Sequence, residues 1–323
     1  MIGMKTFCSR IVLSLMIVAV CAATAPASDS LRVYLVKAGR ALNKSDWKKA
    51  HENYSHVLRL DSTNVEAIRN LGVIASANGR QELAKVYFER AYRLDPNDPD
   101  ICNNLGVIYD NEGNQTRAIE FFHKAVSLDS NDIVGLVNLG NAYSRQGQPG
   151  KGLPMLHRAR ELKPDDWSTL YYLGNCYSSI GNFDSASHYY SKSVEADGNT
   201  ARLYYLLGVA KERLKMFDEA ESNYKLALER SPNQVEVLQR MAVLLSFQTR
   251  YGEAAELYHR IVDIDSTVYP AWISLGTTYY MSRQFARSDT VLYHLFQIDS
   301  TLGFQMTELI QKEIARLKAG QKK

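Results

Sequence analysis

The feature that most constrains this chain is a sequence repeat with a period of 34 residues. An apolar residue followed by glycine recurs at this spacing, with Met241-Ala242 at the single interruption. The pairs are Leu71-Gly72, Leu105-Gly106, Leu139-Gly140, Leu173-Gly174, Leu207-Gly208 and Leu275-Gly276. A small residue keeps the same period at Ala50, Ala84, Ala118, Gly152, Ala186, Ala220, Ala254 and Ser288. A fixed period of this length is the signature of a repeat architecture.

Within each repeat the apolar positions step by three or four residues, which is the spacing of a helix face. In the repeat 167–200, Leu170, Leu173 and Tyr177 share one face, and a turn follows at Gly181. A second face then follows at Ala186, Tyr190 and Val194. Each repeat is therefore predicted to form two antiparallel helices. Because one repeat cannot bury its apolar face alone, stacking of neighbours must create the core.

These positions resemble the pattern of the tetratricopeptide repeat family. The repeat 99–132 carries most of it, with Leu105, Gly106, Tyr109, Ala118, Phe122 and Ala125. The resemblance covers residues 31–302 and implies an all-α fold, a right-handed α-solenoid of eight tandem helix-turn-helix repeats. The expected repeats are 31–64, 65–98, 99–132, 133–166, 167–200, 201–234, 235–268 and 269–302. An amphipathic segment over 303–319 is predicted to form a C-terminal capping helix.

The N-terminal residues have the features of a secretory signal peptide over residues 1–27. Lys5 and Arg10 precede an apolar run, and Ala25-Pro26-Ala27 provides a cleavage site before Ser28. This predicts an exported protein of the bacterial periplasm or cell envelope. The alternative is a lipoprotein anchored to the membrane through Cys21, although Val20 departs from the small residue that lipid attachment requires at that point. The remaining cysteines, Cys102 and Cys176, lie two repeats apart and are expected to be free thiols.

Charge and motifs argue against catalysis and nucleic-acid binding. The chain has 38 Lys and Arg against 35 Asp and Glu, a net charge of +3 that is too small for a nucleic-acid footprint. None of the seven histidines is paired with another four residues away, as a zinc-binding helix would require. Gly150-Lys151 lacks the glycine spacing and the Ser or Thr of a phosphate loop. We expect no enzyme activity, cofactor or metal, and the chain leaves no room for a catalytic domain after its cap.

The resemblance implies that the first helix of each repeat lines a concave surface that binds partners. The residue before Leu-Gly is asparagine in three consecutive repeats, at Asn70, Asn104 and Asn138. An asparagine side chain offers one acceptor and two donor protons, so a row of them could hold the backbone of an extended peptide. The pattern is similar to the asparagine ladder of O-linked N-acetylglucosamine transferases. Neighbouring asparagines that extend it are Asn103, Asn141 and Asn175. The alternative is that asparagine is only a tolerated polar residue on a wet face.

The next two repeats place tyrosines on their first helices. Tyr171, Tyr172 and Tyr205 are predicted to face the groove, whereas Tyr204 is assigned to the core. Exposed tyrosine is favoured at interfaces because it brings contact area at a low entropic cost. We therefore predict a scaffold that binds an extended peptide segment or partner protein in a concave groove outside the cytoplasm. The alternative is an accessory subunit of a cell-envelope assembly or secretion complex.

The repeat 133–166 departs from the pattern where its second helix should begin. Gly150, Gly152 and Pro154 follow one another closely, and all three residue types disfavour a helix interior. The sequence predicts either a helix that starts late or a point at which the solenoid opens easily.

Overall fold

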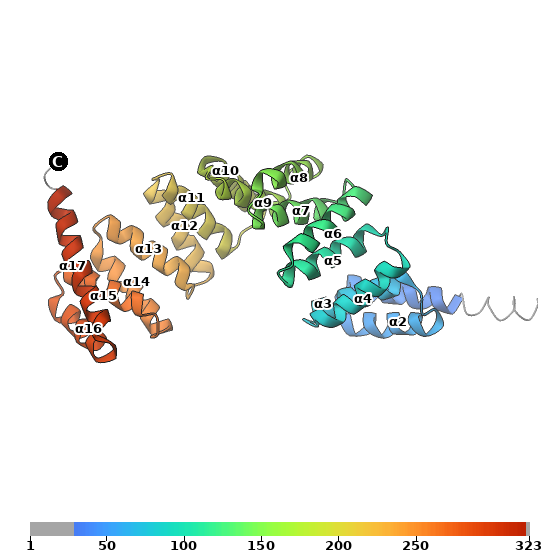
Figure 1. The fold of residues 1–323 in the computed structure, drawn as a ribbon, viewed down its shortest axis with the longest axis horizontal. Coiled ribbons are helices and arrows are strands. Elements are labelled where there is room, and N and C mark those ends of the chain that lie inside the picture. The colour runs from blue at the N-terminus through green and yellow to red at the C-terminus, as the bar shows by residue number, and fades with distance from the viewer. Residues whose placement is uncertain (1–28, 321–323) are drawn as a thin grey trace, which may run out of the picture. The chain divides into compact units, whose positions relative to one another are not determined.

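The computed structural model describes residues 29–320, and every regular element in this range is a helix. The prediction of an all-α fold of tandem helical repeats with a C-terminal helix is confirmed (Figure 1). The predicted signal peptide and Cys21 lie outside the described residues. No helix within residues 29–320 is both long enough and apolar enough to cross a membrane.

The helices come in pairs, and the first helix of each pair is 13 residues long from α3 onward. These are a helix over 29–43, α3 (Val65–Ala77), α5 (Pro99–Asn111), α7 (Ile133–Arg145), α9 (Trp167–Ser179), α11 (Ala201–Arg213), α13 (Val235–Phe247) and α15 (Tyr269–Met281). Their partners are α2 (Trp47–Leu60), α4 (Gln81–Leu94), α6 (Gln115–Leu128), α8 (Pro149–Leu162), α10 (Phe183–Glu195), α12 (Phe217–Arg230), α14 (Tyr251–Ile264) and α16 (Phe285–Ile298). The last helix, α17, spans Ser300–Gly320 and so takes in the end of the expected eighth repeat.

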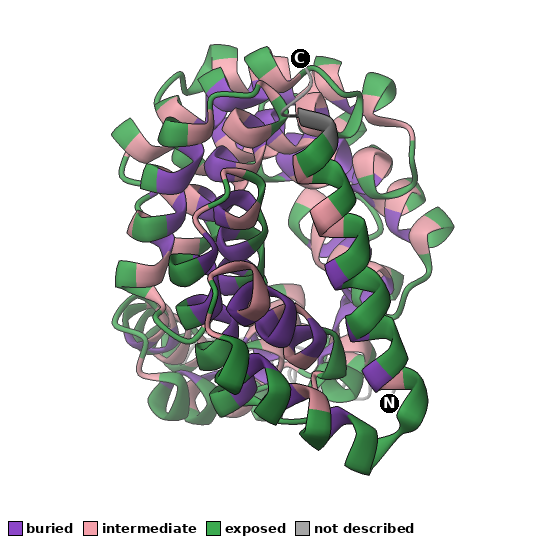
Figure 2. Cartoon of the chain, turned by 90° about the vertical axis from the view of Figure 1, so that its left-hand side faces the viewer, coloured by how far each residue is buried: buried purple, intermediate pink, exposed green. Residues whose placement is uncertain are grey.

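Two compact units divide the chain, one ending at Leu162 and the other beginning at Lys163. Unit 1 holds the helices through α8, and unit 2 holds α9 through α17. Within each unit the buried positions lie where helices meet (Figure 2). Cys102 in unit 1 and Cys176 in unit 2 are not in a disulfide, as predicted, and both are buried.

The two helices of a pair approach closely because the repeated glycine leaves room for a ring. A Cβ atom added to Gly72 would lie 2.7 Å from the Phe88 ring, and one added to Gly208 would lie 2.6 Å from the Tyr224 ring. The last pair differs, because the space beside Gly276 is occupied by the Met306 side chain, which comes from α17 and not from the partner helix α16. Met306 is fully buried, so α17 contributes to the core of unit 2 and does not merely cover its end.

The repeat 133–166 keeps a complete second helix despite its glycines. Helix α8 begins at Pro149, the position equivalent to Gln115 at the start of α6, so the prediction of a late start is wrong. A proline fits the first turn of a helix, because its missing N–H would have no partner there. Gly152 is packed against the backbone of Gly140, whereas a Cβ atom on Gly150 would meet nothing within 4 Å. One of the two glycines is therefore required by packing and the other is not.

Candidate partner-binding surfaces

The three predicted asparagines occupy the same place on α3, α5 and α7 of unit 1, but their surroundings differ. Asn70 is only 9% exposed, whereas Asn104 and Asn138 are half-buried. The predicted row of three asparagines is therefore not equally accessible to a peptide, because Asn70 is buried. The position of a residue within the repeat does not reveal how deeply its side chain is buried.

The other two asparagines use their amide groups as donors within the protein. Asn104 Nδ2 donates to the Asp100 carbonyl of its own helix over 2.8 Å, and Asn138 Nδ2 donates to Asn103 Oδ1 over 2.9 Å. The second bond links α7 to α5. The Oδ1 atoms of Asn104 and Asn138 accept no hydrogen bond from the described residues, and the half-buried Asn141 makes no side-chain hydrogen bond within them. Asn104 and Asn138 thus each keep the Oδ1 acceptor and one of two amide protons for a partner.

Charged residues on the same helices join one repeat to the next. Arg69 of α3 contacts Asp98 over 2.9 Å and Asp100 over 2.8 Å, while Arg145 of α7 pairs with Asp110 of α5. Sequence analysis missed these residues. Opposite charges separated by about one period could have indicated these ion pairs in the sequence. Arg69 and Asp100 are 31 residues apart, and Asp110 and Arg145 are 35 residues apart.

We call this region the polar first-helix surface. It comprises Arg69, Asp100, Asn103, Asn104, Asp110, Asn138, Asn141 and Arg145.

The predicted tyrosines of α9 lie together in unit 2. The rings of Tyr171 and Tyr172 meet edge to face with centroids 5.1 Å apart, and both residues are half-buried. Asn175, on the same helix, accepts a 2.8 Å hydrogen bond from the Tyr190 hydroxyl. Its carbonyl oxygen is therefore engaged in positioning a buried ring, while the tyrosine pair keeps part of its surface accessible.

Of the two tyrosines on α11, the one assigned to the groove is the more deeply buried. Tyr205 is 5% exposed, and its hydroxyl donates to Glu236 Oε1 of α13 over 2.7 Å. Tyr204 is half-buried beneath the Arg230 guanidinium, 4.2 Å from the ring centroid. Burial, together with the Glu236 carboxylate, raises the pKa of Tyr205. The prediction of a groove-facing Tyr205 is wrong, because α13 of the next repeat covers the side on which Tyr205 lies, whereas Tyr204 packs against the core as a partly buried side chain.

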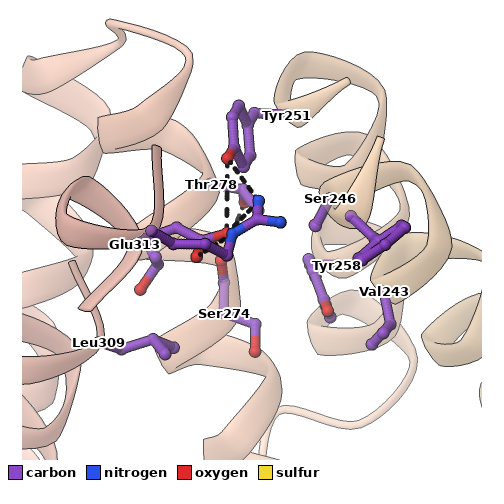
Figure 3. Close-up of a pocket in the computed structure, with 11 residues that line it drawn as sticks. Val243, Ser246, Tyr251, Tyr258, Ser274, Thr278, Leu309 and Glu313 are labelled. Atoms are coloured by element: carbon purple, nitrogen blue, oxygen red, sulfur yellow. Dashed lines mark hydrogen bonds and ion pairs between the residues drawn. The ribbon is translucent and has the colours of Figure 1, made fainter. Parts of the chain in front are cut away.

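Unit 2 also contains a cavity of about 310 Å³ that sequence analysis did not find (Figure 3). It is bounded by α13, α14, α15 and α17. The residues that line it are Val243, Ser246, Phe247, Tyr251, Tyr258, Ser274, Thr277, Thr278, Leu309, Glu313 and Arg316. The exposed Phe247 at the end of a first helix was the one visible signal, and nothing in the repeat pattern places α17 beside it.

Among the described residues, no three His, Cys, Asp or Glu side chains gather in a way that could hold a metal ion.

The comparisons with known proteins agree with this architecture. A tetratricopeptide repeat profile matches residues 65–98, 99–132 and 201–234, and a second tetratricopeptide repeat profile matches residues 143–209. No curated protein matches the chain.

Several solved structures share the fold. The Cut9–Hcn1 hetero-tetramer of the APC/C is 18% identical, with a TM-score of 0.64 over 76% of this chain and 48% of that one. The chain thus spans about half the length of that relative. PilF of Pseudomonas aeruginosa is 21% identical, with a TM-score of 0.57 over 64% of this chain and 94% of that one. PilW, a type IV pilus biogenesis factor, is 19% identical, with a TM-score of 0.57 over 62% and 94%.

The paired helices, the glycine-and-ring packing between them and the two matching profiles lead to one conclusion. The chain belongs to the tetratricopeptide repeat family, and its stacked helix pairs form a protein-interaction scaffold.

Proposed function

We propose that this protein binds an extended segment of a partner protein on the polar first-helix surface of unit 1. The observation that supports this is the pair of half-exposed acceptors, Asn104 Oδ1 and Asn138 Oδ1, repeated on consecutive first helices. Backbone N–H groups of an extended peptide are obligatory donors that such acceptors would satisfy. The Arg69 and Arg145 contacts hold neighbouring first helices together, so the acceptors keep a fixed spacing.

Peptides selected from a random-sequence display library against the whole protein would provide the test ligands. Changing both Asn104 and Asn138 to alanine removes two acceptors, and we expect the dissociation constant to rise roughly 5- to 150-fold. The measurement is a calorimetric or fluorescence titration of each selected peptide, with a melting curve for every variant.

Asn53→Ala is a matched control. Asn53 Nδ2 donates to the Lys49 carbonyl of its own helix over 2.7 Å, as Asn104 does to Asp100, but Asn53 lies on the second helix α2. This variant should bind like the parent. If the folded double variant also binds every selected peptide like the parent, the asparagines are not the binding groups.

We further propose that the protein acts outside the cytoplasm, supported by the signal features of residues 1–27. Mass spectrometry of the protein from its native cell should find Ser28 at the N-terminus. An acylated Cys21 would indicate membrane anchoring instead.

The second candidate function is that of an accessory subunit in a cell-envelope assembly complex, a role that suits the fold shared with PilW. The two candidates differ in the state of the native protein. A protein that acts alone should be recovered from the native envelope as a free chain, whereas an accessory subunit should be recovered within a stable complex.

A further inference from the structure

The cavity of unit 2 shares no residue with the polar first-helix surface of unit 1 (Figure 3). Its volume of about 310 Å³ is at the lower end of the range of ligand pockets in proteins. One wall is α17, which contributes Leu309, Glu313 and Arg316, and the opposite wall is α13. The chemical class of its ligand can be inferred from its walls, its hydroxyl groups and its charges.

The walls near the opening are apolar. Val243 is 48% exposed and Phe247 is 59% exposed on α13, and Leu309 of α17 is 38% exposed. Exposed apolar side chains around a cavity favour a ligand that removes them from water, at roughly 25 cal/mol for each Å² buried. An apolar ring or chain therefore suits the outer part of the cavity.

The hydroxyl groups of α13 and α15 can only accept hydrogen bonds from a ligand. Ser246 Oγ donates to the Ala242 carbonyl over 2.8 Å, and Thr277 Oγ1 donates to the Ile273 carbonyl over 2.8 Å. Two further hydroxyls of α15 behave in the same way, those of Ser274 and Thr278. A hydroxyl has one proton and two lone pairs, so these groups have acceptor capacity but no proton left to give. The Tyr258 hydroxyl of α14 interacts with Ser246 and Ser274 and takes up part of this capacity, whereas Thr277 and Thr278 keep theirs.

The charges that line the cavity neutralise each other. Arg316 donates to Glu313 from both Nε and Nη2 over 2.9 Å, and Nη2 also donates to the Tyr251 hydroxyl over 3.2 Å. The hydrogen bond to Glu313 raises the pKa of Arg316, so the guanidinium stays charged. A charged ligand would lose its hydration without gaining an unpaired opposite charge, and this arrangement disfavours it.

We propose that this cavity binds the side chain of a tyrosine presented by a partner protein. The ring would lie between Val243, Phe247 and Leu309, and the phenol O–H would donate to the hydroxyl oxygens of α13 and α15. The hydroxyl of a tyrosine lies at the far end of its ring. When the ring enters the cavity, this hydroxyl therefore reaches the inner part first. Only the source of the tyrosine, a protein chain, rests on the proposed function.

The test uses N-acetyl-tyrosinamide titrated into the whole protein and followed by ligand-observed NMR. N-acetyl-phenylalaninamide differs only by the missing hydroxyl, and we expect it to bind roughly 2- to 13-fold more weakly. Equal or tighter binding of the phenylalanine compound would overturn the proposal. Tighter binding of N-acetyl-tryptophanamide would overturn the assignment of a phenol.

Substitutions at one repeat position locate the site. Val243→Trp should fill the cavity and reduce N-acetyl-tyrosinamide binding at least tenfold. The control is Val209→Trp, at the same position of α11 one repeat earlier, where the residue is half-buried and does not line the cavity. Val243→Ala is the alternative variant if the tryptophan variant does not fold. It leaves the cavity open and should weaken N-acetyl-tyrosinamide binding, because it removes part of the wall. If the folded variants at Val243 bind like the parent, the site is elsewhere.

The outcome is separable from that of the proposed function. The variant with alanine at both Asn104 and Asn138 should bind N-acetyl-tyrosinamide like the parent, because those residues lie in unit 1. If tyrosinamide binds at the cavity while selected peptides ignore the asparagines, only the proposed function fails. If the asparagines bind peptides while tyrosinamide does not bind, only the cavity proposal fails.

Discussion

At the scale of single residues, the turn that ends each first helix shows how one backbone angle selects a residue. Gly79, Gly113, Gly147 and Gly181 occupy this turn with φ between 73° and 80°. The equivalent position in other pairs has a side chain at the same kind of angle, including Thr249 with φ 63°. A left-handed conformation costs an L-residue roughly 1–2 kcal/mol, and a β-branched residue suits it poorly.

Replacing Thr249 with glycine should therefore stabilise unit 2 by about 0.5–1 kcal/mol. The gain is smaller than the full strain because glycine also gives more entropy to the unfolded chain. Thr249 is exposed, so the change removes little packing. Urea unfolding followed by circular dichroism measures the effect. The reverse change, Gly113→Ala, should destabilise by a similar amount, and a loss of stability in Thr249→Gly would contradict this account of the turn.

At the scale of elements, α8 shows that residues that disfavour helices can still be required in one. Gly152 permits the close approach of α8 to Gly140 of α7, and Pro149 suits the first turn. Pro154 lies inside the helix and cannot donate a backbone hydrogen bond there. The helix forms because its packing on α7 outweighs these local penalties.

Two matched substitutions separate the local from the tertiary contribution in α8. Gly150→Ala should stabilise unit 1 by less than about 1 kcal/mol, because alanine is the better helix former and the site, in the first turn of α8, is open. Gly152→Ala should destabilise it, by about 1–3 kcal/mol, because the new methyl group would press on the Gly140 backbone. Thermal unfolding of both variants gives the comparison. If Gly152→Ala stabilises as much as Gly150→Ala, the two helices are free to separate.

At the scale of the whole molecule, each unit has a core of its own, and that of unit 2 includes the last helix. Met306 of α17 is fully buried against Gly276 of α15, and Arg316 of the same helix bonds to Tyr251 of α14. The predicted capping helix therefore does more than shield the end of the repeats. It completes the last helix pair and forms one wall of the cavity.

Removing the Met306 side chain should loosen the end of unit 2. Met306→Ala leaves a buried void, and we expect a cost of about 2–5 kcal/mol. Hydrogen exchange resolved by mass spectrometry should show faster exchange in α15 and α17, with unit 1 unchanged. Met216→Ala is the control, because Met216 is 38% exposed in the same unit. Undiminished protection of α15 in Met306→Ala would show that α17 is not needed there.

The sequence by itself determined the repeating part of this protein. The 34-residue period, the helical spacing of its apolar residues and the glycine turns specify helix pairs and the ring that packs between them, as Gly72 and Phe88 show. These features are local or recur in each repeat, so the structure predicted for one repeat applies to the others. The all-α fold and the buried thiols followed from them.

Only the tertiary structure decided how each repeat is covered by its neighbours. Tyr205 is buried against Glu236 of the next repeat, because contacts between repeats depend on side chains about one period apart that differ from copy to copy. The cavity depends on α17, which follows the repeats and has no second copy to predict it. Periodicity predicts the helix face on which a residue lies, but the burial of that residue depends on which side chains of the neighbouring helix pack against that face.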